Sequence, residues 1–204
     1  MLTFYLALLF MGDARAQSVA SVCNNESEMY LSIQPRAQET PSWCWVASAQ
    51  MAMDTFGTFI DQCNQVDDVY WRNLPVSCCI NPWQNACNKG GWPRFDYYDF
   101  NSRIIVSPRV IDWIGLTGQI CQKRPVLVAV KWKQGGSHMF VVFGYKVEDN
   151  GEQSVFYIDP CMSNDESSGQ CVAGTGRIPF DRFIHDPADD YIHWVDYIEI
   201  FRLP

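Results

Sequence analysis

The sequence of 204 residues lacks any apolar run near the roughly 20 residues that a membrane-spanning helix needs. It is also poor in basic residues: 15 Lys and Arg stand against 23 Asp and Glu, which gives a formal net charge of −8. An acidic chain is repelled by the phosphate backbone of nucleic acids. We therefore expect neither a nucleic-acid partner nor a membrane partner for the mature chain.

The sequence has no internal repeat, low-complexity tract or long run of charge that would mark a linker between domains. Its 48% hydrophobic and 14% aromatic content is that of a globular protein with a core. Residues 2–10 are apolar, and Ala14 and Ala16 are the small residues that signal peptidase requires. We predict a signal peptide over residues 1–16, followed by one domain over residues 17–204.

Cysteine is unusually frequent, with nine residues. Cytosolic enzymes rarely carry so many, so the count predicts a secreted or periplasmic protein, which we expect to be a monomer. Nine cysteines allow four disulfides and one free thiol. The adjacent Cys78 and Cys79 should bond to different partners, since a bridge between neighbours strains the peptide link. Cys161 and Cys171 flank a polar loop and are the pair that we expect, while the pairing of the others stays open (Cys23, Cys63, Cys78, Cys79, Cys87 and Cys121).

The N-terminal half has helical character. Residues 43–56 predict a buried helix, because apolar residues recur at helical spacing and most other positions are apolar too. Residues 58–93 are loop-rich, and residues 93–100 suggest one short helix. Residues 104–115 fit either a helix or a strand. Thr117 is expected to cap a brief helix that ends before the next proline.

The C-terminal half has strand character. Asn150 and Gly151 form the strongest short hairpin signal, between the second and third of four expected strands. Asp159 is expected to end the third strand, with Pro160 terminating it. The sequence thus predicts an α+β fold with a helical N-terminal half and an antiparallel β half. Runs of β-branched and aromatic residues place the four strands at residues 126–132, 139–145, 154–158 and 191–201.

Cys44 is the candidate for the free thiol, because it lies in the first turn of the predicted buried helix. Unpaired backbone N–H groups and the positive end of the helix dipole favour a thiolate there. A thiolate is the nucleophile of covalent catalysis. The alternative is a small buried hydrophobic residue, which is what most free cysteines are.

A cysteine nucleophile needs a base, and the sequence offers three histidines. His138 follows the flexible residues 135–137 (GGS) and begins an apolar strand, which delivers it to the edge of the sheet. His185 lies in a polar loop and His193 in the final strand, and we interpret these two as surface or satisfied core residues. His138 is therefore the candidate base.

Two further residues complete the predicted catalytic group. Asp159 lies on the strand that the hairpin pairs with the strand of His138, so it can accept a hydrogen bond from the imidazole and orient it. Acyl transfer also needs donors for the developing oxyanion. The backbone N–H of Cys44 is one, and the side-chain amide of Gln38, six residues earlier, is the other.

These residues resemble the papain-like cysteine peptidases, and are most similar to the small bacterial C39-like group of bacteriocin-processing peptidases and secreted plant-pathogen effector proteases. The resemblance implies a helix carrying Cys44 that faces a β subdomain carrying His138 and Asp159, with the active-site cleft between them. It also implies a protein or peptide substrate and neither cofactor nor metal. Papain relatives of plants and animals have Asn where this chain has Asp159. The motifs that carry the likeness occur in the family's order: Gln38, residues 41–45 (PSWCW), residues 135–138 (GGSH) and residues 157–160 (YIDP).

Other functions compete with a peptidase. Papain-like folds also host transamidases and glutamine deamidases, which form the same thioester intermediate. A non-catalytic secreted binding or toxin module is a third possibility, against which the intact catalytic group weighs. A zinc site is disfavoured because Cys78 and Cys79 are adjacent and the histidines lack ligand spacing.

Overall fold

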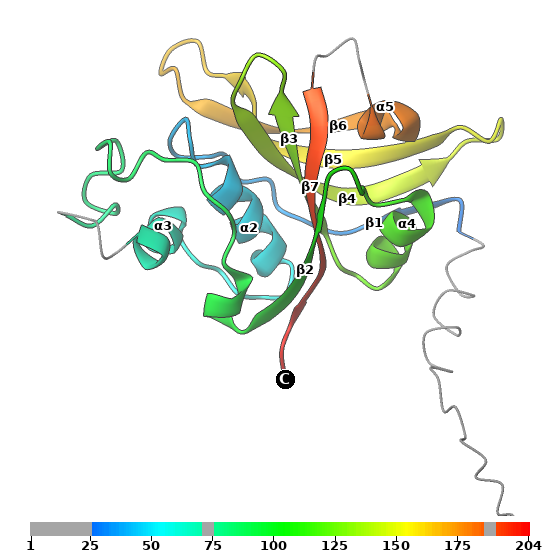
Figure 1. Ribbon diagram of the computed structural model, residues 1–204, viewed down its shortest axis with the longest axis horizontal. Helices are drawn as coiled ribbons and strands as arrows, with labels where there is room; N and C mark the ends of the chain where they lie inside the picture. The colour runs from blue at the N-terminus through cyan, green and yellow to red at the C-terminus, as the bar shows by residue number, and fades with distance from the viewer. Residues whose placement is uncertain (1–25, 71–75, 186–190) are drawn as a thin grey trace, which may run out of the picture.

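The computed structural model describes residues 26–70, 76–185 and 191–204. Within them, seven strands form one antiparallel sheet in the order β2-β7-β3-β4-β5-β6, with β1 paired to β4. Figure 1 shows α2 and α3 on one side of this sheet and α4 and α5 on the other. The predicted signal peptide over residues 1–16 lies outside the described residues, as does Cys23.

The elements follow one another along the chain with helices concentrated before the main strands. The helices are α2 (Cys44–Asp54), α3 (Gln62–Tyr70), the 3-10 helix η2 (Phe95–Tyr98), α4 (Trp113–Cys121) and α5 (Phe180–Ile184). The strands are β1 (Glu28–Tyr30), β2 (Phe100–Val106), β3 (Val126–Trp132), β4 (Ser137–Val147), β5 (Gln153–Asn164), β6 (Cys171–Pro179) and β7 (Tyr191–Arg202).

The predicted α+β architecture is confirmed. Strand β3 has the predicted bounds, and β4, β5 and β7 include the predicted runs. The expected hairpin joins β4 to β5, and Gly151 adopts a φ of 83°, which glycine reaches without steric cost. No helix in the described part of the chain is long and apolar enough to span a bilayer.

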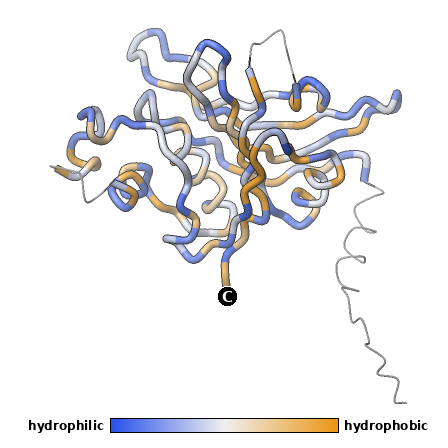
Figure 2. The backbone as a smooth tube through the Cα atoms, in the orientation of Figure 1, coloured by the Kyte–Doolittle hydropathy of each residue, from blue (hydrophilic) through white to orange (hydrophobic). Residues whose placement is uncertain are grey.

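The sheet separates two hydrophobic clusters. Alternate residues of β3 and β4, such as Ala129 and Met139, pack against α2. The residues between them, such as Val128 and Val130, pack with α4 and α5. This alternation follows from the two-residue period of a strand. Figure 2 shows hydrophobic positions gathered in the central strands and hydrophilic positions in the outer loops.

Helix α2 is the central helix of the N-terminal half. Three alanines favour helix formation, and every residue from Trp45 to Met53 is buried. The Ser48 hydroxyl donates a 3.1 Å hydrogen bond to the carbonyl of Met139 on β4. This buried bond fixes the helix against the strand that begins at Ser137, so the start of α2 lies beside the start of β4.

The expectation that Asp159 and Pro160 end the third strand is wrong. Strand β5 continues to Asn164, and its pairing with β6 is irregular between Asp159 and Ser163. Proline has no N–H for the ladder, so within a sheet it is tolerated at such irregular positions. Pro160 therefore interrupts the regular pairing without ending the strand.

The expected cap at Thr117 is also wrong. The carboxylate of Asp112 caps α4 by accepting a 2.7 Å hydrogen bond from the backbone N–H of Gly115. Thr117 lies inside the helix, where its hydroxyl donates to the carbonyl of Trp113. The ambiguous residues 104–115 contain the end of β2 and the beginning of α4, which explains their mixed pattern.

Candidate active site

Cys44 is the first residue of α2 and is partly exposed. It is the free cysteine among those that the structure describes. The residue before it, Trp43, makes no side-chain capping bond, so the first-turn N–H groups of the helix have no side-chain cap. Such uncapped N–H groups, at the positive end of the helix dipole, attract negative charge.

Two indoles attach the loop between α3 and η2 to the start of α2. The Trp43 ring donates a 2.9 Å hydrogen bond to the carbonyl of Cys87, and the Trp45 ring donates one of 3.1 Å to that of Lys89. A Cβ at Gly91 would lie 2.8 Å from the Trp45 ring, so glycine is needed for this close approach. The role of Gly91 was not predicted from the sequence. The one hint there is that the Gly90-Gly91 pair follows a cysteine-rich loop.

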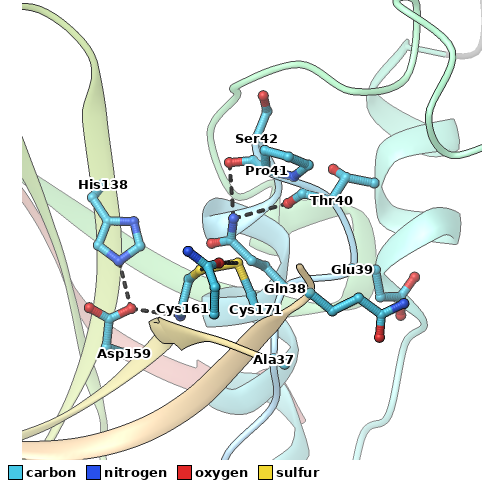
Figure 3. The surroundings of a disulfide bond; sticks show 12 residues. Ala37, Gln38, Glu39, Thr40, Pro41, Ser42, His138, Asp159, Cys161 and Cys171 are labelled. Atoms are coloured by element: carbon cyan, nitrogen blue, oxygen red, sulfur yellow. Dashed lines mark hydrogen bonds and ion pairs between the residues drawn. A yellow bond between two sulfur atoms is a disulfide. The ribbon is translucent and has the colours of Figure 1, made fainter. Parts of the chain in front are cut away.

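His138 and Asp159 meet across the β4–β5 hairpin. Figure 3 shows the imidazole pointing to the carboxylate, and the His138 Nε2 to Asp159 Oδ1 distance is 2.7 Å. The same Oδ1 accepts a 2.7 Å hydrogen bond from the backbone N–H of Cys161. Each of the two side chains is 20% exposed. The Asp159 carboxylate is thus fixed by the backbone N–H of Cys161 and contacts the His138 ring.

The surroundings of His138 favour its charged form. Burial acts to lower the pKa of the imidazole, but hydrogen bonds to Asp159 and Cys44, together with the charges of these two groups, outweigh it and raise the pKa to about 10. The imidazolium therefore persists at neutral pH. His138 thus contacts the predicted carboxylate and lines the same cavity as the predicted thiol.

Gln38 lies close to the start of α2, but its amide is already engaged. Its Nε2 is 3.0 Å from the carbonyl oxygen of Thr40 and 2.9 Å from that of Pro41. Both hydrogens of the amide are donated to these carbonyls, so neither is left for a substrate oxygen in this arrangement. The backbone N–H of Gln38 donates to the carbonyl of Pro160, which ties this loop to strand β5.

A buried glutamine of α3 holds the backbone on both sides of Gln38. The Gln62 amide donates a 2.8 Å hydrogen bond to the carbonyl of Ala37 and accepts one of 3.1 Å from the N–H of Glu39. Sequence reasoning missed this role, because Gln62 lies in a segment interpreted as loop. Its polar character gave no signal of burial.

A cavity of about 260 Å³ lies between the two halves of the molecule, and both Cys44 and His138 line it. Trp45, Gly91 and Trp92 form part of one wall, and Ala129 and Met139 form part of the other. Among the described residues, no group of three His, Cys, Asp or Glu side chains is placed to hold a metal ion. The arrangement can bring a thiol, an imidazole and a carboxylate to a polypeptide lying in this cleft.

The other two histidines do not line this cleft. His185 is exposed and follows the end of α5. His193 is buried, with its Nε2 2.6 Å from Asp196 Oδ1 and its Nδ1 3.3 Å from the carbonyl of Phe183. These are the surface and satisfied core positions expected for them.

The described disulfides join Cys63 to Cys79, Cys78 to Cys87 and Cys161 to Cys171. The adjacent cysteines thus bond to different partners, and the last disulfide is the expected pair. Cys121 is also disulfide-bonded. The Cys161–Cys171 bridge begins two residues after Asp159, so it clamps the irregular part of β5 that supports this carboxylate.

Comparison with known proteins agrees with this geometry. The model of the Peptidase_C39 like family matches residues 30–173, which is more than half of the chain. No curated protein matches the sequence. Among solved structures, a recombinant stem bromelain precursor is similar, with a TM-score of 0.51 and 11% identity over 91% of this chain and 72% of that chain. The bromelain protease of Ananas comosus in complex with the inhibitor E64 gives a TM-score of 0.46 and 12% identity over 88% of this chain and 100% of that chain.

At these identities the structural likeness concerns the fold alone. The bromelain precursor, with its TM-score of 0.51, shares this fold. It supports the expected papain-like arrangement of helices and antiparallel sheet. The family match carries the activity. The chain belongs to the Peptidase_C39 like family and is a cysteine peptidase with a papain-like α+β fold.

Proposed function

We propose that this peptidase hydrolyses peptide bonds through a thioester on Cys44, with His138 as general acid and base and Asp159 as its orienting residue. The observation that carries the proposal is the position of His138, whose Nε2 lies 2.7 Å from Asp159 Oδ1 and which lines the same cavity as Cys44. A nucleophile, a base and an orienting acceptor in contact are the recurring parts of covalent acyl transfer.

The reaction proceeds in two halves. The Cys44 sulfur, its proton held by His138, attacks the scissile carbonyl carbon to form a C–S bond and an oxyanion. The C–N bond then breaks as His138 donates the proton to the leaving amine. A water molecule next attacks the thioester carbon while His138 takes its proton, and the C–S bond breaks to release the carboxylic acid and the thiolate.

The oxyanion needs donors at the start of α2. We assign the backbone N–H of Cys44 to this role, since it belongs to the uncapped first turn. The Gln38 amide is the second donor in this proposal. It must exchange one of its bonds to the Thr40 and Pro41 carbonyls for the substrate oxygen, because both of its hydrogens are engaged in the structure.

Alkylation of the folded, unreduced protein near pH 6 should add one label per chain, on Cys44. A thiol paired with a protonated imidazole reacts rapidly there, whereas an ordinary thiol with a pKa near ~8.5 reacts slowly. Peptide mapping by mass spectrometry measures the position and the rate. The His138→Ala variant serves as the control and should be labelled much more slowly. Cys44 found in a disulfide of the active protein would refute the assignment.

Substitution of Asp159 should move the alkaline limit of activity to lower pH. The imidazolium of His138 is present below its pKa of about 10 and is lost above it. Because Asp159 helps to raise this pKa, Asp159→Asn should begin to lose activity at lower pH than the unmodified enzyme. The measurement is kcat/KM from pH 5 to 11, with circular dichroism at each pH to confirm that the protein stays folded.

The same carboxylate should tolerate an amide better than truncation. Asp159→Asn retains an oxygen that can accept hydrogen bonds from His138 and from the N–H of Cys161, whereas Asp159→Ala retains none. We expect Asp159→Asn to keep more activity near neutral pH. An unchanged alkaline limit together with equal losses in both variants would remove Asp159 from its orienting role.

Peptide cleavage itself is tested on a peptide library, with products read by mass spectrometry and ammonia release measured in parallel. New peptide termini that depend on Cys44 support hydrolysis. Ammonia or a new amide in their place would assign the same residues to a deamidase or transamidase. Because the chain is disulfide-rich, we further propose a secreted or periplasmic setting. We also propose that it acts as a monomer on protein or peptide substrates.

A further inference from the structure

A second cavity of about 330 Å³ shares His138 and Asp159 with the proposed catalytic group. The cross-strand pair of Val130 with His138 places both residues on the sheet face turned away from α2. Phe140 and Tyr157 line the same cavity. His138 therefore lines both this cavity and the cleft that contains Cys44.

Apart from the catalytic pair, the lining of this cavity is apolar or aromatic. The rings of Phe140 and Tyr157 have centroids 5.3 Å apart, and those of Trp132 and Tyr191 lie 5.9 Å apart. Trp132 ends β3 and is 39% exposed, which leaves it accessible at the surface. Aromatic walls with a few polar groups are typical of pockets that bind apolar ligands, and this volume lies in their range.

The chemistry of the reaction fixes which part of a substrate lies beside His138. The ring must donate a proton to the leaving nitrogen, so this nitrogen comes within hydrogen-bond distance of the imidazole. The residue that bears the nitrogen follows the scissile bond. The side chain of this following residue is thus the substrate group nearest to the second cavity, which His138 lines.

We propose that this cavity binds the side chain of the residue immediately after the scissile bond, and that it selects large apolar or aromatic side chains. This inference rests on the proposed function. His138 and Asp159 are each still 20% exposed. A bound apolar side chain would exclude water from their hydrogen bond, which strengthens in a less polar environment. The side chain should therefore affect kcat as well as KM.

The test uses peptides that carry a sequence already shown to be cleaved and differ in the single residue after the scissile bond. Phe, Trp or Leu at this position should give kcat/KM values about 10- to 100-fold above those for Ala, Ser or Glu, the range of discrimination that one apolar pocket provides. Both kcat and KM are recorded for every peptide.

Two variants connect the preference to this cavity. Trp132→Ala removes an aromatic wall and should reduce the Phe-to-Ala ratio of kcat/KM at least about fivefold. Ile178→Phe narrows the cavity and should select against Trp more than against Leu. Tyr97→Ala is the matched control, since Tyr97 is a 47% exposed aromatic residue on η2 outside this cavity, and it should leave the ratio unchanged.

The outcomes separate this inference from the proposed function. Peptide cleavage and Cys44 labelling with a flat preference after the scissile bond would overturn the cavity assignment alone. Absence of both cleavage and labelling would overturn the proposed function. A preference that persists unchanged in Trp132→Ala and Ile178→Phe would place selectivity elsewhere and would also refute the assignment.

Discussion

Cys44→Ala is expected to reduce peptide hydrolysis by roughly 10⁴-fold or more, because the thioester has no other nucleophile. The fold should survive, since the side chain is partly exposed at the first residue of α2 and its loss leaves only a small gap. The measurement is kcat/KM on a cleaved peptide, together with the thermal unfolding midpoint of the variant.

Cys44→Ser serves as a volume-matched control for this variant. It replaces the sulfur by an oxygen of much weaker nucleophilic power, so it should be nearly as inactive while packing as the cysteine does. Substantial hydrolysis by a folded Cys44→Ala protein would disprove the nucleophile and, with it, the whole mechanism.

His138→Ala is expected to be about as damaging as Cys44→Ala. The two residues act as one unit in the attack and in the protonation of the leaving amine, so their losses should not add. The activity of the double variant should therefore lie within a fewfold of that of the less active single variant. Single-turnover measurements on all three variants test this directly.

His185→Ala is the suitable control for the base assignment. His185 is exposed after α5, so its replacement should change activity only modestly. His193 is less suitable because it is buried against Asp196, where a substitution affects stability as well. Inactivation by His185→Ala alone would transfer the role of base to that residue.

Several parts of the fold could be predicted because their signals are local. Strand β3 is a short apolar run with a valine at every second position and an aromatic end, and this local pattern predicts its bounds. The hairpin between β4 and β5 follows from Asn150-Gly151. The buried helix α2 follows from apolar residues on most of its faces.

Elements that depend on distant partners were missed. Helix α3 is polar along most of its length, and its glutamines Gln62 and Gln65 are buried where they bond to the distant carbonyls of Ala37 and Val46. Strand β6 contains two glycines and little apolar surface, and it exists through its pairing with β5. No local pattern announces such contacts.

The sequence by itself determined which chemical groups the site contains and in which order they occur: an amide at Gln38, a thiol at a helix start and an imidazole at a strand start. Only the tertiary structure decided how these groups meet, because the distances depend on the packing of α2 against β4 through Ser48 and Met139. It also showed that the donors of Gln38 face backbone carbonyls. The aromatic cavity lined by His138 likewise arises from five strands and α5, whose residues are far apart in the chain and become neighbours only when the sheet forms.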